Sequence, residues 1–135
     1  MLQERLEGKW IDCFAAVFER CKLAPGEVAA ILSESQSRPI NVQLAELALH
    51  RLGAQPFHIV VPTPAQSSPV PVRSTGASDV IQNIRPVVGA LASTSFVVDC
   101  TVEGLLHAPE LPEILQGGAR VLMISNEHPE AVERL

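Results

Sequence analysis

The stretch SFVVDCTVEGLLHAPELPEILQGGARVLMIS, residues 95–125, decides the fold because it contains a complete strand–helix–strand unit. Short apolar runs, SFVVDCT and RVLMIS, stand at its two ends and are typical of strands that are buried on both faces. Between them, APELPEILQGG predicts a short helix that ends at the two glycines. A helix that connects two strands of one sheet in this way normally makes them parallel, with a right-handed crossover. The stretch therefore predicts a parallel sheet.

The first half of the chain shows the same alternation of helix and strand. An amphipathic helix is predicted over residues 2–21, because apolar residues recur there every three or four positions. The segment SRPINVQLAELALHRLGA predicts a second helix, with Ser37 as its cap, Pro39 near its first position and Gly53 just past its end. With the strands of the opening stretch, the predicted strands lie near residues 27–33, 57–62, 95–100 and 120–125.

The second half of the chain contains the less regular segments. TPAQSSPVPVRSTGAS, residues 63–78, predicts a surface loop rich in Pro and Ser. A further helix is predicted within residues 78–94, where Pro86 must end, kink or restart it. The final segment, HPEAVERL, begins another helix that is barely two turns long. We expect residues 1–135 to be a single α/β domain. Because the last helix is so short, we expect this domain to be the N-terminal domain of a longer two-domain enzyme.

These elements predict an α/β fold, a three-layer Rossmann-like domain with a four-stranded parallel sheet and helices on both faces. We expect the strand order 2-1-3-4, although the order 3-2-1-4 satisfies the same crossover rules. In the first order, the direction of winding reverses between the first and third strands. Ligands of such sheets bind beyond the carboxyl ends of the strands at this switch point. The Ser33–Ser37 turn and the Asp99–His107 loop should therefore be neighbours.

Composition and charge argue against several classes of partner. The chain has 135 residues, which suits one domain, and a formal net charge of −5. Because it has no run of Lys or Arg, we expect no nucleic-acid partner and no anionic membrane surface. No apolar run approaches the roughly 20 residues of a membrane span, and the charged N-terminus is not a secretory signal. Three cysteines without CxxC spacing favour reduced thiols in the cytoplasm. Assembly into a homo-oligomer stays open.

The common cofactor and catalytic motifs are absent from the sequence. The turn after the first strand, SESQSRPIN, has no glycine and so lacks the fingerprint of a dinucleotide site. Its hydroxyl groups either cap the following helix or form a rim for a small polar ligand, with Ser35 as the candidate residue. No HExxH motif or close pair of His and Cys ligands predicts a metal site, and no GxSxG elbow predicts a hydrolase.

Histidine and aspartate residues are the remaining candidates. His50, His58 and His128 lack partners that would make a site, so we interpret them as structural, with His128 at a helix start. Asp99, at the end of the third predicted strand, either faces the crevice or caps a turn. His107 is either a surface residue that begins a short helix or an acid–base group beyond the strand ends. A histidine suits the second role because it gains or loses a proton near neutral pH.

Four segments carry a resemblance to a known family. FVVDC, LLHAPE, EILQGGARVLMIS and PEAVERL resemble the N-terminal half of 2,5-dihydroxypyridine 5,6-dioxygenase, an iron(II) ring-cleaving enzyme of nicotinic acid breakdown. That family is similar to metallo-aminopeptidases related to aminopeptidase T. The resemblance implies that Leu106 and His107 reach the substrate and that His107 acts on its proton. It also implies that a C-terminal catalytic domain holds the iron(II), so this chain should hold no metal and be inactive by itself.

Three hypotheses follow for the function of the chain. In the first, it is the N-terminal, substrate-contacting domain of an iron(II)-dependent dioxygenase that cleaves 2,5-dihydroxypyridine or a similar aromatic diol. The catalytic residue would be His107 and the substrate-binding residues Leu106, Ser35 and Asp99; the same domain of a metallo-aminopeptidase is the alternative in this class. The second hypothesis is a module that binds a small ligand at its hydroxyl-rich turn. The third is a non-catalytic interaction domain whose N-terminal helix docks on a partner.

Overall fold

The computed structural model describes residues 5–64 and 79–134, and within them it contains four strands and five helices. The strands are β1 (Val28–Glu34), β2 (Gln55–Val61), β3 (Phe96–Asp99) and β4 (Arg120–Met123). The helices are α1 (Gly8–Arg20), α2 (Pro39–Arg51), α3 (Arg85–Ala92), α4 (Leu111–Gln116) and α5 (Pro129–Glu133). All strand pairs are parallel, in the order β2-β1-β3-β4. The α/β fold and the predicted strand order are therefore confirmed.

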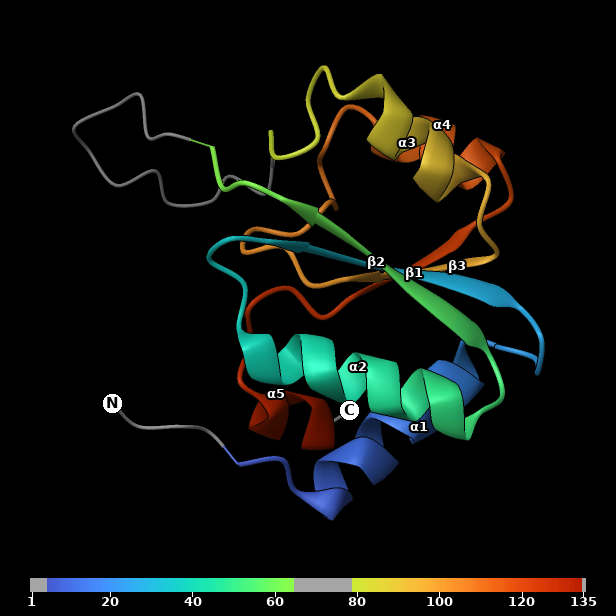
Figure 1. Cartoon of the computed structure of the whole chain (residues 1–135), viewed down its shortest axis with the longest axis vertical. Coiled ribbons are helices and arrows are strands. Elements are labelled where there is room, and N and C mark those ends of the chain that lie inside the picture. Colours follow the sequence, from blue (N-terminus) through green and yellow to red (C-terminus); the bar gives the residue numbers. More distant parts are fainter. Residues whose placement is uncertain (1–4, 65–78, 135) are drawn as a thin grey trace.

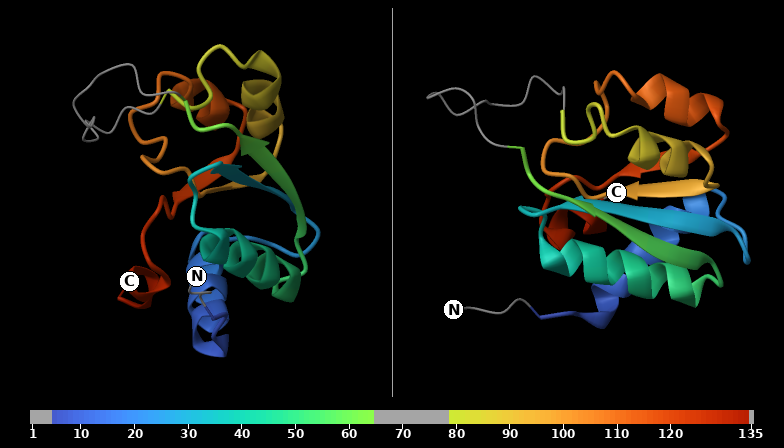
Figure 2. Two further views of the ribbon diagram at one scale, coloured as in Figure 1. Left: turned by 60° about the vertical axis from the view of Figure 1, so that its left-hand side comes forward. Right: turned by 45° about the horizontal axis from the view of Figure 1, so that its top comes forward.

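Helices cover both faces of the sheet, which gives the predicted three-layer, Rossmann-like architecture (Figure 1). Helices α1, α2 and α5 lie on one face, and α3 and α4 lie on the other, as Figure 2 also shows. Each face has its own buried cluster of apolar side chains. Ala29 and Ile31 of β1 belong to the cluster under α1 and α2, whereas Ala30 and Leu32 belong to the cluster under α3 and α4. The central strand β1 thus contributes to both cores.

The apolar face of α1 is buried against the sheet, as the spacing predicts. Phe18 is fully buried, and its ring meets Phe14 and Phe96 edge-on, with centroid distances of 6.2 and 5.5 Å. The helix begins at Gly8, later than predicted. Leu6 precedes it and is 44% exposed, so this residue does not belong to the buried face. Residues 2–4 of the predicted helix lie outside the described residues.

The prediction that Ser37 caps α2 is wrong. The residue at the cap is Arg38, which makes no capping hydrogen bond with its side chain. The Ser37 hydroxyl instead accepts a hydrogen bond from the Glu34 amide at 2.9 Å and donates one to the Cys100 carbonyl oxygen at 2.7 Å. The Ser37 side chain, which the local sequence pattern assigned to the helix cap, thus bonds a carbonyl oxygen just after β3.

The helix predicted within residues 78–94 is shorter than expected because Pro86 restarts it. Helix α3 begins at Arg85, with proline in its first turn, where the missing amide hydrogen costs nothing. Asn83 before it has a φ of +64°, which no α-helix contains. Most of the loop predicted for residues 63–78 lies outside the described residues. Within the described part of the chain, no helix is long and apolar enough to cross a membrane.

The packing of α1 on the sheet gives a stability prediction. Phe18→Ala should lower the free energy of unfolding by about 3–5 kcal/mol, because it removes a fully buried ring from between α1 and β3. Leu47→Ala is the matched control on α2, since Leu47 is 38% exposed and should cost only about 0.5 kcal/mol. Urea denaturation of both variants measures the difference, and equal losses would contradict the assignment of Phe18 to the core.

Candidate functional site

The carboxyl ends of β1 and β3 meet at the predicted switch point. The Cys100 amide donates to the Leu32 carbonyl oxygen at 2.8 Å, which extends the pairing of the two strands by one residue. The Glu34 carboxylate then accepts a hydrogen bond from the Val102 amide at 3.0 Å. With the bond from Ser37 to Cys100, these contacts confirm that the Ser33–Ser37 turn and the Asp99–His107 loop are neighbours.

Asp99 organises the loop that follows β3. Its side chain is fully buried, and its Oδ1 accepts hydrogen bonds from the Thr101 amide at 3.0 Å and the Thr101 hydroxyl at 2.5 Å. Its Oδ2 accepts a hydrogen bond from the Leu105 amide at 2.7 Å. Burial raises the pKa of the Asp99 carboxyl, while these hydrogen bonds act in the opposite direction. Asp99 therefore caps the turn, one of its two predicted roles, and its contact with substrate stays a prediction.

The same loop also packs against the turn after β4. Gly104 has a φ of +76°, and a Cβ atom at this position would lie 2.7 Å from the Ser125 hydroxyl oxygen. The amides of Ile124 and Ser125 both donate to the Asp99 carbonyl oxygen at 2.9 Å. Main-chain bonds and a close approach at glycine thus join the ends of β3 and β4.

Leu106 and His107 form an exposed pair, which we call the tip, between two buried anchors. Leu105 is fully buried and Ala108 is 3% exposed, and both belong to the core under α3 and α4. The Ala108 amide donates to the Leu105 carbonyl oxygen at 3.0 Å, which closes a tight turn. Leu106, by contrast, is 60% exposed, and His107 is exposed as well. The tip therefore offers an apolar surface and an imidazole to a ligand beyond the end of β3.

Ser35 lies at the end of β1, on the side that faces β2. Its amide donates to the Val61 carbonyl oxygen at 3.1 Å, and its hydroxyl accepts a hydrogen bond from the Thr63 amide at 3.3 Å. The Gln36 amide donates to the Thr63 hydroxyl at 3.0 Å. Ser35 is exposed, but its hydrogen bonds tie it to β2 and not to the tip. The structure thus groups Asp99 with the tip, whereas Ser35 is tied to the end of β2.

Negative charge surrounds the switch point. Burial raises the pKa of the Glu34 carboxyl, and the charges of Asp99, Glu103 and Asp79 raise it further. This group of acids, together with the missing glycine-rich turn, is not typical of a phosphate site. Across residues 5–64 and 79–134, no three His, Cys, Asp or Glu side chains are grouped so that they could hold a metal ion. The described residues therefore do not fit an iron(II) site.

The other histidines have structural positions. The His128 Nδ1 atom accepts a hydrogen bond from the Glu130 amide at 3.2 Å, which makes it the predicted cap of α5. His58 lies within β2, where its Nε2 atom is 2.5 Å from a carboxylate oxygen of Glu46. His50 is exposed on α2. Among the cysteines, Cys100 is fully buried, and burial raises the pKa of its thiol to about 12, so it stays protonated.

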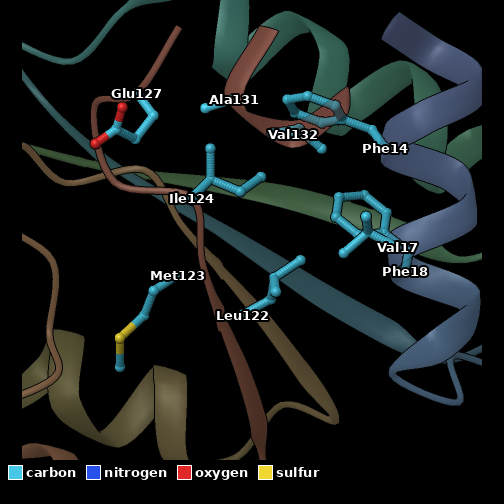
Figure 3. A pocket seen from close by; sticks show the side chains of 9 residues that line it. All are labelled: Phe14, Val17, Phe18, Leu122, Met123, Ile124, Glu127, Ala131 and Val132. Carbon is cyan, nitrogen blue, oxygen red and sulfur yellow. The ribbon is translucent and has the colours of Figure 1, made fainter. Parts of the chain in front are cut away.

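A pocket of about 150 Å³ lies between α1, β4 and α5 (Figure 3). Its lining is apolar except for one acid, and consists of Phe14, Val17, Phe18, Leu122, Met123, Ile124, Glu127, Ala131 and Val132. The sequence does not reveal this pocket because two stretches about 100 residues apart in the chain, residues 14–18 and 122–132, form it. It contains none of the predicted site residues, and most of its lining belongs to the core opposite the one that anchors the tip.

Comparison with known proteins identifies the family. The chain matches the model of the NicX family, 2,5-dihydroxypyridine 5,6-dioxygenase, over residues 9–135, a range that includes the tip. The chain belongs to this family. The resemblance seen in the sequence of this NicX family member is thereby confirmed. No curated protein sequence matches the chain.

The fold of the chain is shared with a solved dioxygenase structure. The 2,5-dihydroxypyridine dioxygenase from Pseudomonas putida KT2440 superimposes with a TM-score of 0.81 and 26% sequence identity. The match covers 93% of this chain and 36% of that chain, so this NicX family member spans about a third of the dioxygenase. Klebsiella oxytoca NpsA in complex with 3-hydroxyanthranilyl-AMSN gives a TM-score of 0.48 and 19% identity, over 93% of this chain and 19% of that chain. The chain is thus a dioxygenase-related α/β domain.

The hydrogen bonds of Asp99 give a prediction for the loop. Asp99→Asn should lower the free energy of unfolding by about 1–3 kcal/mol, because an amide has only one acceptor oxygen and leaves the buried Thr101 or Leu105 amide unpaired. Asp79→Asn is the matched control, because Asp79 is exposed. Urea denaturation together with amide hydrogen exchange at Thr101 and Leu105 measures the effect. Unchanged exchange at both amides would show that the carboxylate does not hold the loop.

Proposed function

We propose that the chain is the substrate-contacting domain of a ring-cleaving dioxygenase that acts on 2,5-dihydroxypyridine or a similar aromatic diol. The observation that carries this proposal is the exposed Leu106–His107 tip at the carboxyl end of β3. The family match supports the type of reaction, because it includes these two residues. The P. putida dioxygenase supports a longer parent protein, because this chain corresponds to 36% of it.

The tip supplies two kinds of contact with an aromatic diol. Leu106 packs against the face of the ring, and a nitrogen of the His107 imidazole accepts the proton of a ring hydroxyl. Loss of this proton makes the ring richer in electrons and so easier to oxidise. Ser35 is proposed as a further hydrogen-bonding contact at the neighbouring strand end. Asp99 acts through the loop that it holds, and any direct contact with substrate is secondary to this role.

The charge around the tip is consistent with an uncharged substrate. Glu34 and Asp99 lie beneath the loop, and Glu103 lies within it, three residues before Leu106. An aromatic carboxylic acid would be repelled by these groups, whereas a neutral hydroxylated heterocycle would not. The acidic surroundings therefore support a diol such as 2,5-dihydroxypyridine.

Iron(II) would supply the reaction with oxygen in the complete enzyme. The residues that the structure describes do not fit such a site, so we propose that a C-terminal catalytic domain of the parent protein holds the metal. The role of this chain is then limited to binding, orientation and proton transfer. The cytoplasm, which the unpaired cysteines favour, is the compartment that we propose.

The proton-transfer role of His107 gives a kinetic prediction. In the full-length protein, His107→Ala should lower kcat for 2,5-dihydroxypyridine by about 10²–10⁴-fold, the usual cost of a lost general base. Stability should change little, because the side chain is exposed. The measurement is steady-state kinetics with iron content determined in parallel, so that metal loss is not mistaken for loss of the base.

His50→Ala is the matched control, because His50 is equally an exposed histidine but lies on α2. It should leave kcat unchanged. Equal activity of the two variants would show that His107 is only a surface residue of the loop before α4 and would remove the basis of the proposed function.

A further inference from the structure

A buried carboxylate at the end of β1 has no part in the proton transfer just described. The Glu34 side chain is enclosed, with the residue 6% exposed, although three other acids lie around it. A carboxylate in such a place costs free energy, because burial and like charges both disfavour its ionised form. An apolar side chain would avoid this cost. The position of Glu34 therefore calls for a contact that only an acceptor can make.

That contact is the hydrogen bond from the Val102 amide to Oε1 of Glu34, at 3.0 Å. It differs in kind from the bonds of Asp99. Asp99 binds Thr101 and Leu105, which follow it within six residues, so its bonds set the internal shape of the loop. Glu34 is 68 residues away from Val102 and lies on the neighbouring strand. Its bond fixes where the loop stands relative to β1.

We propose that Glu34 is a positioning residue for the tip. By accepting a hydrogen bond from the Val102 amide, it holds the loop over the junction of β1 and β3 and so sets the direction in which Leu106 and His107 face the substrate. It acts through Val102 and does not touch the substrate. The hydrogen bond itself is a feature of the fold. Its effect on catalysis rests on the proposed function.

Two substitutions separate the hydrogen bond from the charge and the volume of the side chain. Glu34→Gln keeps an oxygen that can accept the hydrogen bond from the Val102 amide but removes the ionisable group. Glu34→Met has a similar length and no comparable acceptor. If the bond positions the loop, the glutamine variant should behave like the parent and the methionine variant should not.

Amide hydrogen exchange in the 135-residue chain tests the bond directly. Glu34→Met should lower the protection of the Val102 amide by about tenfold or more, because the hydrogen bond to Glu34 is lost. Glu34→Gln should keep it within about threefold, and the amide of Val97 in β3 serves as the reference for global stability. Protection at Val102 that is unchanged in Glu34→Met, relative to Val97, or that falls equally in both variants, would overturn the proposal.

Kinetics of the full-length protein with 2,5-dihydroxypyridine tests the consequence. Glu34→Met should lower kcat by about 10–100-fold, since a small misplacement of a catalytic group has effects of this size, and Glu34→Gln should restore most of the activity. If Glu34→Met frees the Val102 amide but leaves kcat unchanged while His107→Ala lowers it, the positioning role is wrong. If His107→Ala also leaves kcat unchanged, the proposed function fails instead.

Discussion

The burial of the Asp99 carboxylate is the constraint on which the candidate site depends. A carboxylate enclosed at the end of a central strand must find hydrogen-bond donors, and the chain after β3 turns back to provide them from Thr101 and Leu105. This turn brings Leu105 and Ala108 into the core and leaves only Leu106 and His107 outside between them. The tip is thus exposed because the residues on either side of it, Leu105 and Ala108, are held in the core.

The acids at the switch point also explain how this domain differs from the nucleotide-binding members of its fold class. A glycine-rich turn there would place the amides at the start of a helix next to a phosphate. In this chain, the Glu34 side chain bridges β1 and the loop after β3, and Asp99 lies beside it. The recognition site that we propose is instead the tip, which offers an apolar side chain and an imidazole in place of an anion site. A neutral aromatic diol suits this arrangement better than a phosphate.

The features that depend on local pattern could be predicted from the sequence. Short apolar runs predicted the positions of the strands. The right-handed crossover rule left two possible strand orders, one of which the sheet adopts. Ser37 was assigned wrongly because its partner, the Cys100 carbonyl oxygen, is 63 residues away in the chain. The two roles of Asp99 could not be separated because burial at a strand end leaves no periodic signal. The role of Glu34 could not be predicted either, because its hydrogen-bond partner, the Val102 amide, is 68 residues away in the chain.

The central claim is that the tip contacts the substrate, and a ligand-bound structure tests it most directly. Crystals of the full-length protein with 2,5-dihydroxypyridine, grown without oxygen, should show the ring packed against Leu106. A ring hydroxyl should then lie within about 2.6–3.2 Å of a nitrogen of His107. A ring bound elsewhere, with Leu106 and His107 still exposed to solvent, would contradict the account.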